Sequence, residues 1–326
     1  MITTRTVLVL GAGASAPYDF PTGKQLKDKV VRLSTQKGAR QLLTECGFSE
    51  KQINCLAQSL GRSGQSSIDA FLERRPELQD VGKAAIAAML LPHESDKHLF
   101  PMGKRNNRSD SDHEDNWYEL LFNMLTEGAV KWQDLEANEL SIITFNYDRS
   151  FEHYLFTALQ ESYGIGNDDA RTAASFIRVE HVYGSLGKLP WQGTTDASHI
   201  VPYGARHTIE NVRRAADSVI ILSEGEVNSE AFCQARLQLS NATRVYLLGF
   251  GYHPTNLGRL GMQSESMRKF TQHQVARTIL GLPAWLESKI DEFPSLENLR
   301  RGQGNLFKET VYSFLHKHVT LKGWLA

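Results

Sequence analysis

The feature that most constrains the fold is a glycine-rich turn close to the start of the chain. Four apolar residues, Val7 to Leu10, come directly before the sequence Gly11-Ala12-Gly13-Ala14-Ser15-Ala16. Leu26, Val30 and Leu33 then recur at the i, i+4, i+7 spacing that places side chains on one helix face. A buried strand, a tight turn and a helix in this order predict the opening unit of a doubly wound sheet.

The rest of the chain repeats this alternation. Short apolar runs typical of strands follow at 142–145, 179–183, 219–222 and 245–248, and helical patterns at 149–160, 208–217 and 229–240 separate most of them. Such alternation predicts βαβ units and a parallel sheet. We therefore expect an α/β protein with a Rossmann-like doubly wound parallel sheet. Residues 1–255 form one domain with a helical insert at 34–135, and 256–326 form a helical extension packed on the same domain.

Several local signals lie within the predicted insert. Ser49 and Gln52 have the spacing of a capping box, and Ser67 and Asn116 are placed to begin helices. Residues 103–115 hold no apolar side chain, which predicts a mobile loop.

Composition excludes several classes of protein. The 36 Lys and Arg residues nearly balance 37 Asp and Glu, which argues against direct nucleic-acid binding. The three cysteines form no CxxC pair, so neither a disulfide framework nor a four-cysteine zinc module is expected, and no metal is predicted. No segment approaches the roughly 20 apolar residues of a membrane span. We expect a soluble cytoplasmic protein.

The glycine-rich turn fits the G-x-G-x-x-[GA] pattern of dinucleotide-binding loops. Small residues there let the backbone approach a pyrophosphate at a helix N-terminus. The alternative is a tight strand-to-helix turn without a ligand. In an ordinary NAD dehydrogenase a second strand ends in an acidic residue about 20 positions further on. Here that stretch, Asp28 to Val31, lies inside a helical pattern, which argues against a dehydrogenase.

Polar residues follow two further strands, at the sheet edge where α/β proteins bind ligands. Thr144-Phe145-Asn146-Tyr147-Asp148 comes directly after the predicted strand at 142–143. The Asn146 amide can orient a water or a ribose hydroxyl, or serve a turn. Asp148 can accept from a sugar hydroxyl, or cap the next helix.

His181-Val182-Tyr183-Gly184-Ser185 ends another predicted strand. Since strand side chains alternate, His181 and Tyr183 are expected on the same side. His181 can act as a general base on water or a ribose hydroxyl, or be a structural histidine. Gly249 and Gly251 follow the run at 245–248, where they permit a ligand to approach or simply form a turn.

Together these stretches resemble the sirtuin family, most closely its bacterial branch in anti-phage defence. Residues Gly11 to Ser15 look like the family's GAG-x-S loop, and Asp19-Phe20 look like its D-F segment, with Pro21 in place of arginine. Thr144 to Asp148 is similar to the T-x-N-x-D motif. Gly249 to Gly251 occupies the place of the late G-T-S loop. The order and spacing agree over about residues 5–255.

Two departures qualify what this resemblance implies. Tyr183 stands where sirtuin deacetylases have their catalytic histidine, the nearest histidine being His181, and the four zinc cysteines are absent. The resemblance implies hydrolysis of NAD+ to nicotinamide and ADP-ribose in anti-phage defence, without zinc, with a homo-oligomer or a defence protein as partner. It implies that Asn146 and His181 are catalytic. The NAD+-binding residues it implies are Gly11, Ala12, Gly13, Ser15, Asp19, Phe20, Thr144, Asp148, Tyr183, Gly184, Ser185, Gly249 and Gly251.

Three other functions stay open at this point. The first is a module that binds NAD+ or ADP-ribose without catalysis and switches a partner, which the tyrosine at position 183 favours. The second is a protein deacylase or ADP-ribosyltransferase, against which the missing zinc cysteines argue. The third is a nuclease-linked or protein-interaction component, for which the sequence offers only the basic cluster at 104–108.

Overall fold

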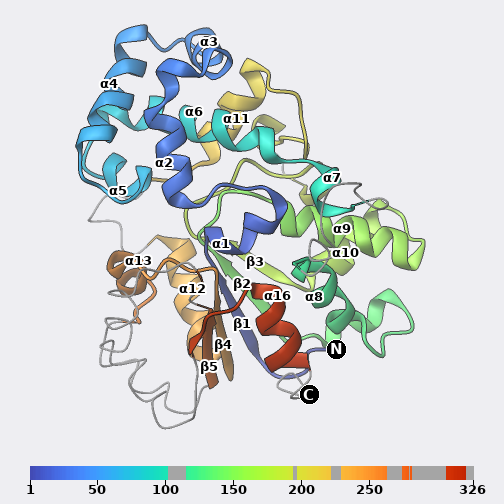
Figure 1. Ribbon diagram of the computed structural model, residues 1–326. Helices are drawn as coiled ribbons and strands as arrows, with labels where there is room; N and C mark the ends of the chain where they lie inside the picture. The colour runs from blue at the N-terminus through green and yellow to red at the C-terminus, as the bar shows by residue number, and fades with distance from the viewer. Residues whose placement is uncertain are drawn as a thin grey trace.

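A single parallel sheet forms the centre of the molecule. The computed structural model describes residues 1–101, 115–193, 197–221, 229–262, 274–278, 280 and 306–320. The strands within these ranges follow the order β3-β2-β1-β4-β5-β6, and every pair is parallel (Figure 1). Doubly wound dinucleotide-binding folds have this strand order, so the predicted Rossmann-like α/β fold is confirmed. The strands are β1 (Thr6–Leu10), β2 (Leu140–Thr144), β3 (Arg178–His181), β4 (Arg244–Leu248), β5 (Gln274–Thr278) and β6 (Leu306–Phe307).

The apolar run that opens the chain is the central strand. All five residues of β1 are buried, because β2 and β4 pair with its two edges and helices cover both faces of the sheet. Leu8 lies opposite Ile142 on one side and Tyr246 on the other. This explains why the strand is continuously apolar and does not alternate. The carboxyl ends of β1, β2 and β4 therefore share one edge of the sheet.

Helices follow the strands as the alternating pattern predicts. The expected helices at 149–160, 208–217 and 229–240 are present within a few residues of their predicted ends. After β1 come α1 (Ala12–Ser15), a 3-10 turn (Ala16–Tyr18) and α2 (Gly23–Val31). After β2 come α9 (Ser150–Tyr163) and α10 (Asn167–Ser175); α11 (Ile209–Ser218) and α12 (Glu230–Asn241) precede β4; and α13 (Pro254–Arg259) follows it.

The insert is helical throughout its described part, and much of it belongs to a separate lobe. We define the helical lobe as α2 to α6 together with α11, which packs on α6. The lobe lies beyond the carboxyl edge of the sheet (Figure 1). The helices of the insert are α3 (Lys37–Glu45), α4 (Glu50–Arg62), α5 (Ile68–Leu72), α6 (Gln79–Leu90), α7 (Asp96–Leu99) and α8 (Trp117–Thr126), with 3-10 turns at Leu33–Thr35, Pro76–Leu78, Leu91–His93 and Trp132–Ala137.

The predicted helix starts are confirmed by their hydrogen bonds. Ser49 and Gln52 form the capping box of α4, Ser67 Oγ accepts from Ala70 N, and Asn116 Oδ1 accepts from Glu119 N. A further capping box, of Thr22 and Gln25, begins α2 and was not predicted.

Two segments differ from the expectation. Residues 219–222 do not form a strand in their described part: α11 ends at Ser218, and Val219 makes one isolated antiparallel bridge with Gly184. The C-terminal segment is not purely helical, because β5 and β6 extend the sheet beside β4 before α16 (Val311–Phe314) and a π-helical turn (Leu315–Thr320). Residues 102–114, most of the predicted loop, lie outside the described part. Within the described ranges no helix is long and apolar enough to cross a membrane.

Candidate functional site

The glycine-rich turn packs directly against the loop that follows β4. Gly13 N donates to Gly249 O at 3.0 Å, and a Cβ at Gly11 would lie 2.6 Å from the same oxygen. Gly249 has a φ of +58°, and its Cβ would lie 2.1 Å from Ala14 N. The close contact between these backbones therefore requires all three glycines. Gly251 is different, because no atom lies within 4 Å of where its Cβ would be.

Asn146 lies in the loop after β2, at this same edge. It is 7% exposed, and its Nδ2 donates to Gly11 O at 3.0 Å and to Ser15 Oγ at 2.9 Å. Its backbone N–H donates to Thr144 Oγ1 at 3.1 Å. Both amide protons are thus used within the protein, and no hydrogen bond reaches Oδ1 from the described residues. Asn146 presents a hydrogen-bond acceptor in a fixed orientation.

His181, at the end of β3, supports this loop from the other side. Its Nδ1 lies 2.9 Å from Asn146 O, and its Nε2 lies 2.6 Å from Glu152 Oε1 on α9. Burial disfavours the charged imidazole, but the Glu152 carboxylate outweighs it and raises the pKa of His181. Burial likewise opposes ionisation of Glu152, and His181 nonetheless holds the pKa of that carboxyl below its usual range. Since Nδ1 faces a carbonyl oxygen and Nε2 faces a carboxylate oxygen, both ring nitrogens are placed as donors.

Strand alternation predicted that Tyr183 lies on the same side as His181. The structure shows that it does not. β3 ends at His181, and the Tyr183 hydroxyl donates to Asn256 Oδ1 at 2.7 Å and accepts from Arg259 Nη1. The Tyr183 ring packs against Phe145 and Phe232, and burial raises the pKa of its hydroxyl. The two side chains that were expected in one pocket thus contact different elements.

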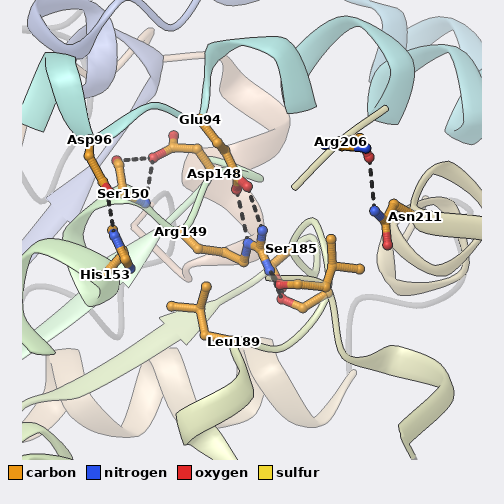
Figure 2. Close-up of polar contacts among 12 residues, drawn as sticks. Glu94, Asp96, Asp148, Arg149, Ser150, His153, Ser185, Leu189, Arg206 and Asn211 are labelled. Carbon is orange, nitrogen blue, oxygen red and sulfur yellow. Dashed lines mark hydrogen bonds and ion pairs between the residues drawn. The ribbon is translucent and has the colours of Figure 1, made fainter. Parts of the chain in front are cut away.

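The loop after β2 is also tied to the chain that follows α6. Arg149 forms a paired contact with Glu94, at 3.0 Å from Nε to Oε1 and 2.6 Å from Nη2 to Oε2 (Figure 2). The Arg149 side chain is 1% exposed and that of Glu94 is fully buried.

Asp148, next to Arg149, accepts hydrogen bonds from the backbone N–H and the hydroxyl of Ser150, and burial raises the pKa of its carboxyl. Asp148 therefore bonds to the first residue of α9, although Arg149 and not Asp148 is the N-cap of that helix.

The other residues that the resemblance implied lie in turns. Asp19 has a φ of 71°, and its largely exposed carboxylate lies 3.2 Å from His93 Nδ1, while Phe20 is buried beside His93. A Cβ at Gly184 would lie 2.1 Å from Ser218 O, and Ser185 Oγ donates to Gly187 O. These four residues have structural contacts of their own, whereas Gly11, Ser15, Thr144, Asn146 and His181 form one connected group.

Of a polar cluster beyond the carboxyl ends of β2, β3 and β4, only Tyr183 was predicted as a site residue. Its members come from the lobe, from the loops after β2 and β3, and from α13. Asn256 lies inside α13, which begins at Pro254. The cluster comprises Asp69, Glu73, Tyr147, Tyr183, Asn256 and Arg259.

A cavity of about 520 Å³ lies away from this edge, beside α9 and α10. Its aromatic lining is paired internally, since Phe156 stacks on Trp191 and His153 stacks on Tyr203. None of the residues that the sequence predicted for the site lines it. The carboxyl edge of the sheet therefore remains the candidate site.

Among the described residues no group of three or more His, Cys, Asp or Glu side chains is arranged to hold a metal ion. No protein-family model matches the chain, and no curated protein matches it. The fold and site thus define an α/β protein with a doubly wound parallel sheet and a buried, oriented polar group where β1, β2 and β4 end.

Proposed function

We propose that this chain is an NAD+ hydrolase of sirtuin type, which converts NAD+ and water to nicotinamide and ADP-ribose in bacterial anti-phage defence. The strand order supports a dinucleotide ligand, because ligands of such sheets bind where the chain leaves β1 and β4 in opposite directions. The observation that carries the proposal is Asn146, whose Oδ1 is a buried and oriented acceptor at that edge.

Asn146 suits the chemistry of this reaction. Cleavage of an N-glycosidic bond passes through a state with positive charge on the ribose, and nicotinamide departs as a neutral molecule. The protein must then hold the ribose and a water close to the reacting carbon. Asn146 Oδ1 can accept from a ribose hydroxyl or from that water. Because its two amide protons are already bonded, it needs no reorientation to do so.

His181 has a positioning role in this proposal. A general base needs a free lone pair, and both nitrogens of His181 face acceptor oxygens of the protein. Its Nδ1 bond to Asn146 O fixes the loop that carries the acceptor. We therefore assign His181 to orienting Asn146 and not to proton transfer.

The glycine-rich turn fits a dinucleotide only in part. The N–H groups of Gly11, Gly13 and Ala14 all donate to protein carbonyls, at Leu248, Gly249 and Gly11. Gly251 has open space beside it, so we place the approach of the pyrophosphate at the loop after β4.

A second candidate is a sensor that binds NAD+ or ADP-ribose and does not cleave it. The contacts of His181 with Glu152 and of Tyr183 with Arg259 favour it, because they engage both groups that could replace the sirtuin histidine. Binding without release of nicotinamide distinguishes the sensor from the hydrolase.

The test is nicotinamide release from NAD+ by the purified protein, measured by chromatography beside calorimetric binding of NAD+. We expect wild type to release nicotinamide and Asn146→Ala to lose roughly a hundredfold or more of the rate. Asn123→Ala, on the exposed face of α8, is the matched control and should behave as wild type. Full activity of Asn146→Ala would overturn the site, and binding without release by wild type would favour the sensor.

A further inference from the structure

The polar cluster beyond β2, β3 and β4 contains a carboxylate that the lobe contributes. Asp69 lies in the first turn of α5, and its Oδ1 accepts a hydrogen bond from the Tyr147 hydroxyl. Ser67 fixes the start of this helix through its bond to Ala70 N. Tyr147 directly follows Asn146 in the loop after β2. Asp69 is thus linked, through one side chain, to the loop that presents the oriented acceptor.

Three other acidic side chains lie near this edge, and two of them are paired with cations. Glu73 pairs with Arg259 at 2.8 Å, and Glu152 pairs with His181 at 2.6 Å. Asp148 Oδ1 accepts both bonds from Ser150. Within the described chain Tyr147 is the only side chain that hydrogen-bonds to Asp69. No described side chain bonds to the second oxygen of Asp69, so that oxygen can accept from a ligand.

We propose that Asp69 is the catalytic residue that accepts the proton in the hydrolysis of NAD+; this inference rests on the function proposed above. The bond between C1′ of the ribose and the nicotinamide nitrogen breaks, and its electron pair leaves with nicotinamide. A water oxygen bonds to C1′, and its proton passes to Asp69 Oδ2. The products are nicotinamide, ADP-ribose and a proton, which Asp69 then returns to solvent.

The surroundings of Asp69 make its carboxylate more basic than an exposed one. Burial raises the pKa of the Asp69 carboxyl, and the hydrogen bond from Tyr147 opposes that rise. The charged groups that face it are Glu73 on the same segment and Arg259 on α13, which raise and lower the pKa respectively. A general base works best when its pKa lies near the working pH.

The experiment compares Asp69→Asn with Asp80→Asn, an exposed acid at the start of α6, as the matched control. Nicotinamide release is measured from pH 4 to 9, with calorimetric binding of NAD+ and thermal unfolding on each protein. We expect Asp69→Asn to lose roughly a hundredfold or more in kcat, as removal of a general base does, while NAD+ still binds and the fold is kept.

Tyr147→Phe keeps the proposal falsifiable if Asp69→Asn does not fold. Loss of the Tyr147 hydroxyl removes a bond that favours the ionised carboxylate, so the pKa of Asp69 rises further. The acid limb of the pH–rate profile should then move to higher pH, a result that a purely structural role of Asp69 does not produce.

The outcomes separate this inference from the function on which it rests. If wild type releases nicotinamide and Asp69→Asn does so at the wild-type rate with the wild-type pH profile, the hydrolase stands and the role of Asp69 is overturned. An unmoved acid limb in Tyr147→Phe also overturns that role. If wild type binds NAD+ without releasing nicotinamide, the hydrolase fails, and the role of Asp69 fails with it.

Discussion

The Nε2 atom of His181 lies 2.6 Å from Oε1 of Glu152, and both side chains are nearly buried. The same imidazole bonds through Nδ1 to Asn146 O. An ion pair between β3 and α9 thus fixes the backbone of the residue that we propose to hold the substrate. In this arrangement His181 contributes to stability as well as to the geometry of the site.

Replacing His181 by Gln should destabilise the protein. The variant leaves the Glu152 carboxylate buried without its charged partner, which commonly costs about 3 kcal/mol. The free energy of unfolding in urea measures the loss. His207→Gln, at an exposed position, is the control and should leave that free energy unchanged.

The loss caused by His181→Gln should depend on pH. The pKa of His181 is raised above its ordinary 6.5, and that of Glu152 is lowered below its ordinary 4.5. The contribution of a raised histidine is complete below 6.5 and disappears as pH rises through its folded pKa. The contribution of Glu152 is complete above 4.5 and disappears as pH falls through its folded pKa. A difference between wild type and variant that is constant from pH 4 to 9 would contradict this assignment.

Arg149→Ala should destabilise the protein far more than Arg171→Ala. Arg149 and Glu94 are buried, so removal of the cation leaves an unpaired buried carboxylate at a cost of about 3–5 kcal/mol. Arg171 also pairs with an acid, Asp168, but their side chains are 51% and 92% exposed. Exposed pairs of this kind contribute about 0–1 kcal/mol. Urea unfolding of both variants tests the comparison, and equal losses would show that Arg149 is not held as the structure has it.

Replacement by alanine should lower the free energy of unfolding strongly at Gly249 and hardly at all at Gly251. In Gly249→Ala the new Cβ meets Ala14 N and the backbone has a positive φ, so the loss should be about 3 kcal/mol or more. Gly251→Ala faces open space and should change the free energy of unfolding by less than about 0.5 kcal/mol. If NAD+ passes Gly251 as we propose, that variant binds NAD+ more weakly at unchanged stability. Unaltered NAD+ affinity in Gly251→Ala would place the pyrophosphate elsewhere.

The sequence predicted the centre of the fold well, for a physical reason. β1 is buried on both faces, so its sequence is continuously apolar. Gly11 and Gly13 pack against Gly249 so closely that no larger residue fits there. An apolar run followed by these glycines therefore indicates a strand and a tight turn unambiguously. The strand β5 is different. It carries Gln274 and the buried Arg277, and its few apolar residues do not distinguish a strand from a helix. The pattern at 256–326 therefore indicated helices where the chain completes the sheet.

The candidate site could be predicted only where it follows a strand. Asn146 and His181 lie at strand ends, and the structure connects them by a hydrogen bond. Asp69 lies on a short helix of the lobe, 78 positions from its partner Tyr147. No local sequence pattern predicts this contact, because the packing of the lobe against the sheet edge brings the two residues together. Alternation likewise failed for Tyr183, since β3 ends two residues before it.

Tyr183→Phe tests how much the hydroxyl of Tyr183 contributes to the reaction, compared with the carboxylate of Asp69. Phenylalanine keeps the ring packing against Phe145 and Phe232 but loses the hydrogen bonds to Asn256 and Arg259, which should cost about 1–3 kcal/mol. Because the Tyr183 hydroxyl is already bonded twice, we expect nicotinamide release to fall by less than about tenfold. Parallel assays of Tyr183→Phe and Asp69→Asn then rank the two groups. If Tyr183→Phe abolishes release at intact NAD+ affinity while Asp69→Asn remains active, the reaction requires the hydroxyl of Tyr183 and not the carboxylate of Asp69.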